Sequence, residues 1–457
     1  MEDITFGLSK YISTAQFESI SPYAITVAKM STLDTLGAML AGSTAEGMDK
    51  LVGLAKNWGG AEQAHLVGFS HRLPAPLAAL CNGAMARAME IDDCLDFLPV
   101  HPSASTIAAL LSYAELKRGM SGRDFLTALS IGQDVIVRMG LTLRKNLLMS
   151  GRGNMFDIFG PTSALAKAIG FGPKEVQNAL GISYSFAIGD GQSLLDGAWT
   201  VKLQQGLLAQ GALLSVLLSS DGFTGPKEFL LGKHGYLNAF EPDPRIEYLT
   251  EGLGNTFNGE RISFKPYSAC RGTHEAIELA LRFHTETGSN MKSIRRVNIQ
   301  VSPEIHKLLG SPAELKIKPA SSQIAQFSIQ FTVAAALMRG DFFLKELEQE
   351  TIKDGDILDL AERVYVEPDP SLRTDFAVGR TVMEIELDGK PPWKRQLDVA
   401  FGSPAHPMDF KDVTEKFMKC VSCARHVPKE TNLRRLIEMV SDLENVSDVS
   451  NLITSLC

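Results

Sequence analysis

The sequence has few cysteines and no cysteine pattern typical of a disulfide-stabilised protein. Six cysteines are spread over 457 residues, too few for a disulfide framework in a chain of this length. An excess of basic charge is also missing, since the net charge is −8 and the pI is near 5.7. This balance argues against nucleic acid or an anionic membrane surface as a partner.

Long apolar runs and a targeting signal are missing as well. No stretch approaches the roughly 18 uninterrupted apolar residues of a membrane span. The start, MEDITFGLSK, is acidic and lacks the apolar core of a secretory signal. We therefore expect a cytoplasmic protein, or the matrix form of an organellar one, with no contact to a membrane.

Several catalytic and metal-binding motifs are absent. The sequence contains no G-x-S-x-G, no His-x-His and no His-x-x-x-His, which removes the usual basis for a serine hydrolase or a zinc site. Cys420 and Cys423 lack a second pair of zinc ligands. Glycines at 169–172 and 189–191 match no phosphate-binding fingerprint. No metal is expected.

The hydrophobic pattern predicts a mainly α protein. Apolar periodicity and helix-boundary residues predict a series of helices at 22–42, 74–93, 101–119, 121–140, 161–172, 173–187 and 199–218. Alternation over 297–301 and 381–402 predicts a strand and a hairpin, with helices at 274–284 and 326–340. The tail after 408 returns to helix.

This order predicts a discontinuous domain organisation. We expect a large all-helical domain, a helical bundle, of residues 1–262 and 405–457, interrupted by an inserted α+β domain of residues 263–404. A cleft between two such domains is a common ligand site.

The stretch FKPYSACRGTHEA, residues 264–276, collects Lys265, Cys270, Arg271 and His274 just before a predicted helix. A helix N-terminus attracts anions, and an arginine adds a bidentate clamp for carboxylate or phosphate. The stretch is therefore a candidate half of an anion-binding site. An exposed loop with ordinary surface cations is the alternative.

A second candidate is EIDDCLDFLPVHPSA, residues 90–104. Glu90, Asp92, Asp93 and Asp96 gather at the predicted C-terminal end of a helix, where the macrodipole disfavours negative charge. Cations from the 264–276 stretch would relieve that cost. His101 follows, where neighbouring carboxylates could tune it as an acid or base. The alternative is a solvated acidic loop with a capping histidine.

Lys202 is a third candidate. It lies in AWTVKLQQG near the start of a strongly apolar predicted helix. A lone lysine on such a face either extends its ammonium to solvent or faces a pocket, and the residues alone favour solvent.

Five blocks in this order resemble the MmgE/PrpD family: EIDD…HPSAS, GPTSALAKAIGF, AWTVKLQQG, SFKPYSACRGTH and AQFSIQFTVAAAL. The family includes 2-methylcitrate dehydratase, cis-aconitate decarboxylase and iminodisuccinate epimerase. The resemblance covers residues from about 5 to about 445. It implies the two-domain fold expected above, a homodimer, a positively charged site between the domains for di- or tricarboxylates, and no metal, flavin or nicotinamide cofactor.

The resemblance also implies roles for single residues. Asp93, His101, Lys202, Lys265 and His274 match catalytic positions, and this raises Lys202 from a surface lysine to a site residue. Glu90, Cys270, Arg271 and His306 are expected to bind substrate, with His306 where some members have a tyrosine.

Two departures bear on the reaction. Cys270 stands where the dehydratases and the decarboxylase have a histidine, and residues 150–160 lack the histidine of the decarboxylase. The pattern of Lys265, Cys270 and His274 is closer to the epimerase. Cis-aconitate decarboxylation is therefore the least favoured of the three reactions.

All family reactions must remove a proton beside a carboxylate and stabilise the resulting enolate with fixed positive charge. Lys202, Lys265 and Arg271 fit that role, and His101 or His274 could be the base. The first hypothesis is a carbon–oxygen lyase of the dehydratase type acting on a 2-methylcitrate-like acid. A two-base epimerase of an iminodicarboxylate is the alternative, and a non-catalytic polycarboxylate-binding protein is a third.

Overall fold

The structure is a computed structural model and describes residues 4–144, 155–288, 291–372 and 378–456. These residues are mainly helical and contain two small sheets, so the prediction of a mainly α protein is confirmed. The chain divides into two compact units. Unit 1 is Met1–Ile262 with Asp409–Cys457, and unit 2 is Ser263–Met408.

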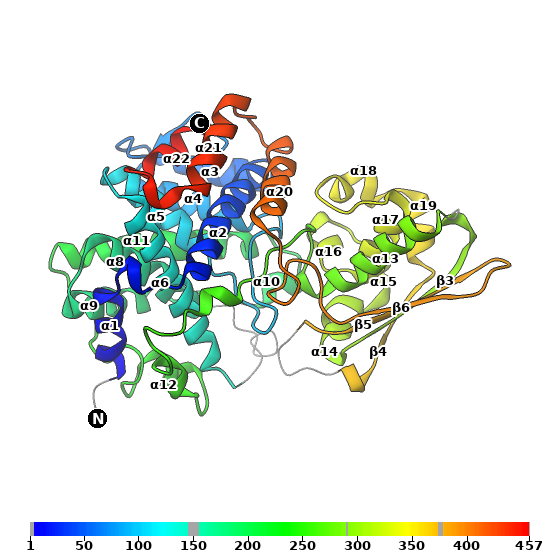
Figure 1. The fold of residues 1–457 in the computed structure, drawn as a ribbon, viewed down its shortest axis with the longest axis horizontal. Helices are drawn as coiled ribbons and strands as arrows, with labels where there is room; N and C mark the ends of the chain where they lie inside the picture. Colours follow the sequence, from blue (N-terminus) through cyan, green and yellow to red (C-terminus); the bar gives the residue numbers. More distant parts are fainter. Residues whose placement is uncertain (1–3, 145–154, 289–290, 373–377, 457) are drawn as a thin grey trace. The chain divides into compact units, whose positions relative to one another are not determined.

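Unit 1 is built from helices and one short hairpin (Figure 1). Its elements are α1 (Ile4–Thr14), α2 (Pro22–Gly42), α3 (Met48–Trp58), β1 (Ala64–His65), β2 (Arg72–Leu73), α4 (Ala75–Arg87), α5 (Ala104–Leu116), α6 (Gly122–Leu141), α8 (Phe159–Ile169), α9 (Pro173–Tyr184), α10 (Gln192–Leu195), α11 (Thr200–Ser220), α12 (Tyr236–Phe240), α20 (Phe410–Ser422), α21 (Glu430–Ser441) and α22 (Ser450–Thr454).

Helices α2, α4, α5 and α11 form the centre of unit 1. Helix α11 packs against α4, α5, α8 and α9, and α2 packs against α4 and α20. Small residues permit these close contacts. A Cβ at Gly83 of α4 would lie 3.0 Å from the backbone of Gly206 on α11. Close packing of α4, α5 and α11 brings together the segments at their ends.

Helix α11 is the one helix of the described residues that is long and apolar enough to cross a bilayer. Over its most apolar 18 residues, 56% of α11 is buried inside the protein. A core helix of a folded domain can have the same length and composition. The apolar run is not uninterrupted, because α11 carries Lys202 near its start.

Unit 2 is an α+β unit. Its elements are α13 (His274–Thr287), β3 (Ile294–Val301), α14 (Pro303–Ile305), α15 (Ala313–Ile317), α16 (Ser322–Gln326), α17 (Ile329–Arg339), α18 (Gln349–Ile352), α19 (Gly355–Ala361), β4 (Val364–Pro368), β5 (Thr381–Leu387) and β6 (Trp393–Leu397).

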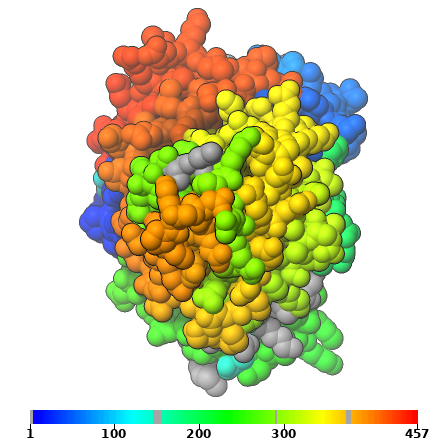
Figure 2. All heavy atoms as spheres, turned by 90° about the vertical axis from the view of Figure 1, so that its right-hand side faces the viewer, coloured from blue at the N-terminus to red at the C-terminus, as the bar shows by residue number. Residues whose placement is uncertain are grey.

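The sheet of unit 2 has the strand order β4-β3-β5-β6. Strands β3 and β4 are parallel, whereas β5 is antiparallel to both β3 and β6. Helix α13 packs against α17, β5 and β6, and α17 packs against β4. Figure 2 shows the β5–β6 hairpin in orange beside the green atoms of the chain that leads into β3.

Most predicted elements are present, but helices α1 and α3 and several short helices were not predicted. The buried alternation of β3 and the antiparallel hairpin β5–β6 agree with the prediction. Strand β4 and the short hairpin β1–β2 were not predicted. The helix predicted for 74–93 ends at Arg87, so the acidic residues that follow it belong to a loop.

Candidate active site

The acidic loop, residues 88–103, connects α4 to α5 in unit 1. Glu90 has φ 54, a left-handed conformation that few residues other than glycine adopt. A helix cannot continue through this conformation, and the residues that follow Glu90 are buried. Glu90, Asp92 and Asp93 are all buried, with exposed fractions of 5%, 0% and 0%.

Counter-charge for this loop comes from within unit 1. Arg87, the last residue of α4, forms an ion pair with Glu90, and its Nη1 lies 3.4 Å from Asp92 Oδ1. Lys416 of α20 donates to the Asp34 carboxylate and to the Ile91 carbonyl. The 264–276 stretch was the predicted source of these cations, and Arg87 and Lys416 were not predicted.

His101 lies at the end of the loop, where the Asp93 carbonyl and the Asp92 carboxylate both lie near its Nδ1. Its Nδ1 donates to the Asp93 carbonyl at 3.0 Å, and Asp92 Oδ2 lies 2.9 Å from the same nitrogen as an ion-pair partner. Because a carbonyl oxygen only accepts, the proton lies on Nδ1. The basic lone pair of the neutral ring is therefore on Nε2. The side chain keeps 14% exposure.

The Asp93 carboxylate points into the helical core. It accepts hydrogen bonds from Ser31 Oγ at 3.0 Å and from the backbone and side chain of Ser103 at the start of α5. Gln133 in turn donates to Ser103 Oγ at 2.9 Å. Burial, with the nearby carboxylates, raises the pKa of Asp93 to about 7 despite these hydrogen bonds.

Lys202 is buried near the start of α11, with an exposed fraction of 5%, so its ammonium does not extend into solvent. Burial lowers the pKa of Lys202, while the charges of Glu46 and Glu90 oppose this shift and Arg87 adds to it. Among the described residues, the ammonium of Lys202 makes no hydrogen bond or ion pair. It is a desolvated cation next to the charged groups of the acidic loop.

The entry loop, residues 263–273, opens unit 2. Phe264 N donates to the Gly402 carbonyl at 2.8 Å, so the chain entering the unit is tied to the chain leaving it. Gly402 has φ +90, and a Cβ there would collide with the Phe264 carbonyl. Lys265 follows this contact and is 1% exposed.

Arg271 and His274, at the end of the entry loop, are held by each other and by backbone carbonyls. Arg271 Nη1 donates to the Phe401 carbonyl at 2.9 Å and lies 3.3 Å from His274 Nδ1. Because a guanidinium only donates, Nδ1 of His274 accepts, and its Nε2 donates to the Ala269 carbonyl 3.2 Å away. The buried imidazole is thus neutral, with both ring nitrogens engaged.

Cys270 belongs to the entry loop, and His306 follows Ile305, which a Cβ at Gly272 of the loop would approach to 2.7 Å. Cys270 is partly exposed. Its thiol lies close enough to Lys316 to affect that ammonium: burial lowers the pKa of Lys316, and Cys270 opposes the shift. His306 begins a π-helical turn at 306–310. That turn packs closely on the entry loop, since a Cβ at Gly272 would lie 2.8 Å from Leu309 Cδ1.

The structure therefore brings the predicted residues together in two groups. Glu90, Asp93, His101 and Lys202 lie around the ends of α4, α5 and α11 in unit 1. Lys265, Cys270, Arg271, His274 and His306 lie on or beside the entry loop of unit 2. Within the described part of the chain, no three His, Cys, Asp or Glu side chains form a metal-binding group.

Comparison with known families identifies both parts of the chain. A model of the MmgE/PrpD N-terminal domain matches residues 7–249, and a model of the MmgE/PrpD C-terminal domain matches residues 267–445. The chain belongs to the MmgE/PrpD family. The resemblance stated from the five sequence blocks is confirmed.

Curated relatives match this MmgE/PrpD chain over nearly its whole length. A cis-aconitate decarboxylase of Aspergillus terreus (strain NIH 2624 / FGSC A1156) is 26% identical over 99% of this chain and 93% of its own. The human cis-aconitate decarboxylase is 24% identical over 100% of this chain and 95% of its own. A cis-aconitate decarboxylase-like protein of Aspergillus oryzae is 24% identical, with coverages of 99% and 96%.

Two side chains beside the candidate residues were not selected from the sequence. Arg87 was not singled out, and its ion pairs appear only in the folded loop. Asp92 was noted in the acidic run but not chosen over Asp93. The adjacent side chains point in different directions, and only Asp92 faces the imidazole of His101.

Proposed function

We propose that the protein is a cofactor-independent lyase that removes a proton next to a carboxylate of a small di- or tricarboxylate. The orientation of His101 supports this most directly. A neutral imidazole whose Nδ1 proton is held by the Asp93 carbonyl and faced by the Asp92 carboxylate presents Nε2 as a base. As the ring gains a proton, Asp92 stabilises the imidazolium, as a buried carboxylate does in a catalytic triad.

Positive charge for the substrate comes from Lys202 in unit 1 and from Lys265 in unit 2. A desolvated ammonium interacts with an anion far more strongly than an exposed one, and the lowered pKa of Lys202 reflects that desolvation. An enolate formed beside a carboxylate needs such fixed charge. That both lysines serve one substrate stays a prediction from the sequence.

His101 is a better candidate for the base than His274. The two ring nitrogens of His274 are engaged by Arg271 and by the Ala269 carbonyl, and the side chain is fully buried. A base in that position would first have to break one of these hydrogen bonds. We assign His274 and Arg271 to positioning the entry loop, and Asp93 to positioning His101 through its backbone.

The dehydratase type, in which the carbanion expels a β-hydroxide from a 2-methylcitrate-like acid, is the first candidate reaction. Cis-aconitate decarboxylation is the second, and the names of the relatives favour it. Against it stand Cys270 at a position of a family histidine and the missing histidine in 150–160, of which 150–154 lie outside the described residues. Epimerisation uses the same proton removal and stays a third.

A substrate panel with three readouts tests the proposal. A new conjugated double bond, detected by ultraviolet absorbance, indicates elimination. Release of carbon dioxide from cis-aconitate indicates decarboxylation. Deuterium entering unreacted substrate from heavy water indicates epimerisation. Binding of tricarboxylates without any of these three signals would refute an enzymatic function.

Substitutions then test the assignment of residues. Lys202→Ala should abolish the detected reaction, and Lys202→Arg should retain part of it, because the charge is kept. Lys50→Ala, on the exposed surface of the same unit, is the matched control and should be as active as the wild type. Full activity of Lys202→Ala would remove Lys202 from the site.

A further inference from the structure

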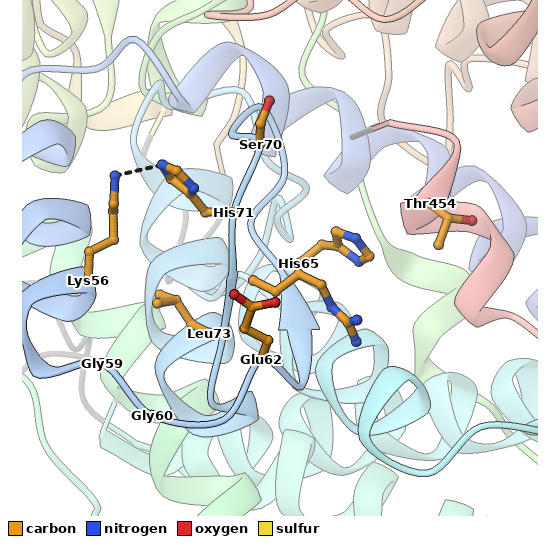
Figure 3. A pocket seen from close by; sticks show the side chains of 10 residues that line it. Lys56, Gly59, Gly60, Glu62, His65, Ser70, His71, Leu73 and Thr454 are labelled. Atoms are coloured by element: carbon orange, nitrogen blue, oxygen red, sulfur yellow. Dashed lines mark hydrogen bonds between the residues drawn. The ribbon is translucent and has the colours of Figure 1, made fainter.

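Unit 1 has a polar pocket that shares no residue with the acidic loop. Its volume is about 550 Å³, and it is formed by the end of α3, the turn at 59–63, the β1–β2 hairpin and Thr454 of α22. Figure 3 shows Lys56 and His71 on one side of the pocket and Thr454 on the other. We call it the hairpin pocket.

Two fixed cations line the hairpin pocket without an acidic partner. Lys56 donates to His71 Nε2 at 2.6 Å, which leaves two of its three ammonium protons for other acceptors. Arg72 donates from Nη2 to the Gln63 carbonyl at 2.9 Å. Among the described residues, neither cation forms an ion pair.

The guanidinium of Arg72 also has a donor with nothing to bind. Its Nε is buried and has no hydrogen-bond partner in the described part of the protein. Leaving a buried donor unsatisfied is unfavourable. This nitrogen is closed off from solvent, so it is the charge of Arg72 at the pocket wall, rather than Nε itself, that attracts an anion.

The acids near the hairpin pocket do not satisfy these cations. Glu115 accepts from the His65 backbone at 2.7 Å and faces His65 Nδ1 at 2.5 Å, so its charge is directed to that imidazole. Glu62 is exposed, lines the pocket and makes no ion pair with either cation. It is the one lining carboxylate that would repel an anion.

The donors suit a tetrahedral anion. Lys56 of α3 and the Arg72 and Ser70 side chains of the hairpin all line the pocket, and together they offer more donors than the two oxygens of one carboxylate would use. Lysine and arginine are the usual phosphate-binding side chains. The volume lies within the roughly 300–1,000 Å³ of small-molecule sites and leaves room for an organic portion.

We propose that the hairpin pocket binds a small anion that carries a phosphate group, held by Lys56 and Arg72. This inference is independent of the reaction proposed above, because its residues are separate from Lys202 and His101.

Calorimetric titration of the full chain with inorganic pyrophosphate tests the proposal. Arg72→Gln and Lys56→Gln should each weaken binding by about tenfold or more, as expected for loss of a charge-assisted contact. Glu62→Gln should strengthen binding, because it removes the repelling carboxylate. Lys50→Gln, which changes the net charge equally on the same helix outside the pocket, should have no effect.

Two further measurements separate this site from the candidate active site. Lys202→Ala should bind pyrophosphate like the wild type, and Arg72→Gln should keep the wild-type turnover. The proposal is overturned if Arg72→Gln and Lys56→Gln bind pyrophosphate normally, or if Lys202→Ala alone abolishes binding. It is also overturned if citrate, but not pyrophosphate, binds in a way that depends on Arg72.

Discussion

The buried carboxyl group of Asp93 should make the protein less stable as the pH rises. In the folded protein the pKa of Asp93 is about 7, mainly because of burial, whereas the ordinary value is 3.8. Between these two pH values the folded state holds a proton that the unfolded state has lost, so the free energy of unfolding falls with increasing pH. At about 1.4 kcal/mol per pH unit, the full effect is about 4 kcal/mol.

Replacing Asp93 with Asn should remove this pH dependence. The amide imitates the protonated carboxyl and can still accept the hydrogen bond from the Ser103 backbone. Urea unfolding of both proteins at several values between pH 4 and about 8 gives the difference in their free energies of unfolding. From pH 4 to about 8, the free energy of unfolding of Asp93→Asn should rise by about 4 kcal/mol relative to that of the wild type. Above about pH 8 this difference should stay constant.

The control is Asp221→Asn, because Asp221 is an exposed carboxylate in the same unit. It should follow the wild type at every pH. Parallel curves for Asp93→Asn and the wild type would show that Asp93 is ionised throughout the range, and the argument from burial would then be wrong.

Three further predictions concern contacts around the acidic loop and the entry loop. Lys416→Met should cost about 3–5 kcal/mol of stability, because it leaves the Asp34 carboxylate buried without its counter-charge. Urea midpoints measure this loss, and adding Asp34→Asn should recover part of it; no recovery would contradict the pairing. Gly402→Ala should lower the melting temperature more than Gly389→Ala, since both have a positive φ but only position 402 lacks space for a Cβ. Equal losses would refute the close crossing at the entrance of unit 2. Asp92→Asn should lower kcat by about 10–100-fold, because the imidazolium loses a charge-assisted partner while a backbone carbonyl still orients the ring. An unchanged kcat would exclude the carboxylate from the reaction.

The sequence predicted the helices well because their signals are local. A long run that is apolar on all sides and begins at Pro22 marks α2, whereas apolar periodicity marks α6 and α13. Alternation marks β3 and β5. Strand β4 was missed because five residues, only one of them buried, carry too little pattern to distinguish a strand from a loop.

The end of α4 could not be predicted, because residues 88–91 are compatible with a helix and the break at Glu90 is a left-handed turn. The charge of Glu90 is balanced by Arg87. The carbonyl of the next residue, Ile91, accepts a hydrogen bond from Lys416, which lies more than 300 residues away in the sequence. The hairpin pocket was missed for a related reason, since its cations are spread over a segment without a motif and become a group only when β1 and β2 pair.

The sequence alone determined the family, the mainly helical fold and the residue types available for acid–base chemistry, because short blocks and periodic patterns carry that information. Tertiary structure decided which of these groups meet and how each is oriented. It placed Asp92 rather than the Asp93 carboxylate beside His101, it buried Lys202, and it engaged both nitrogens of His274. Direction, burial and proton position depend on neighbours distant in the chain, and no local pattern encodes them.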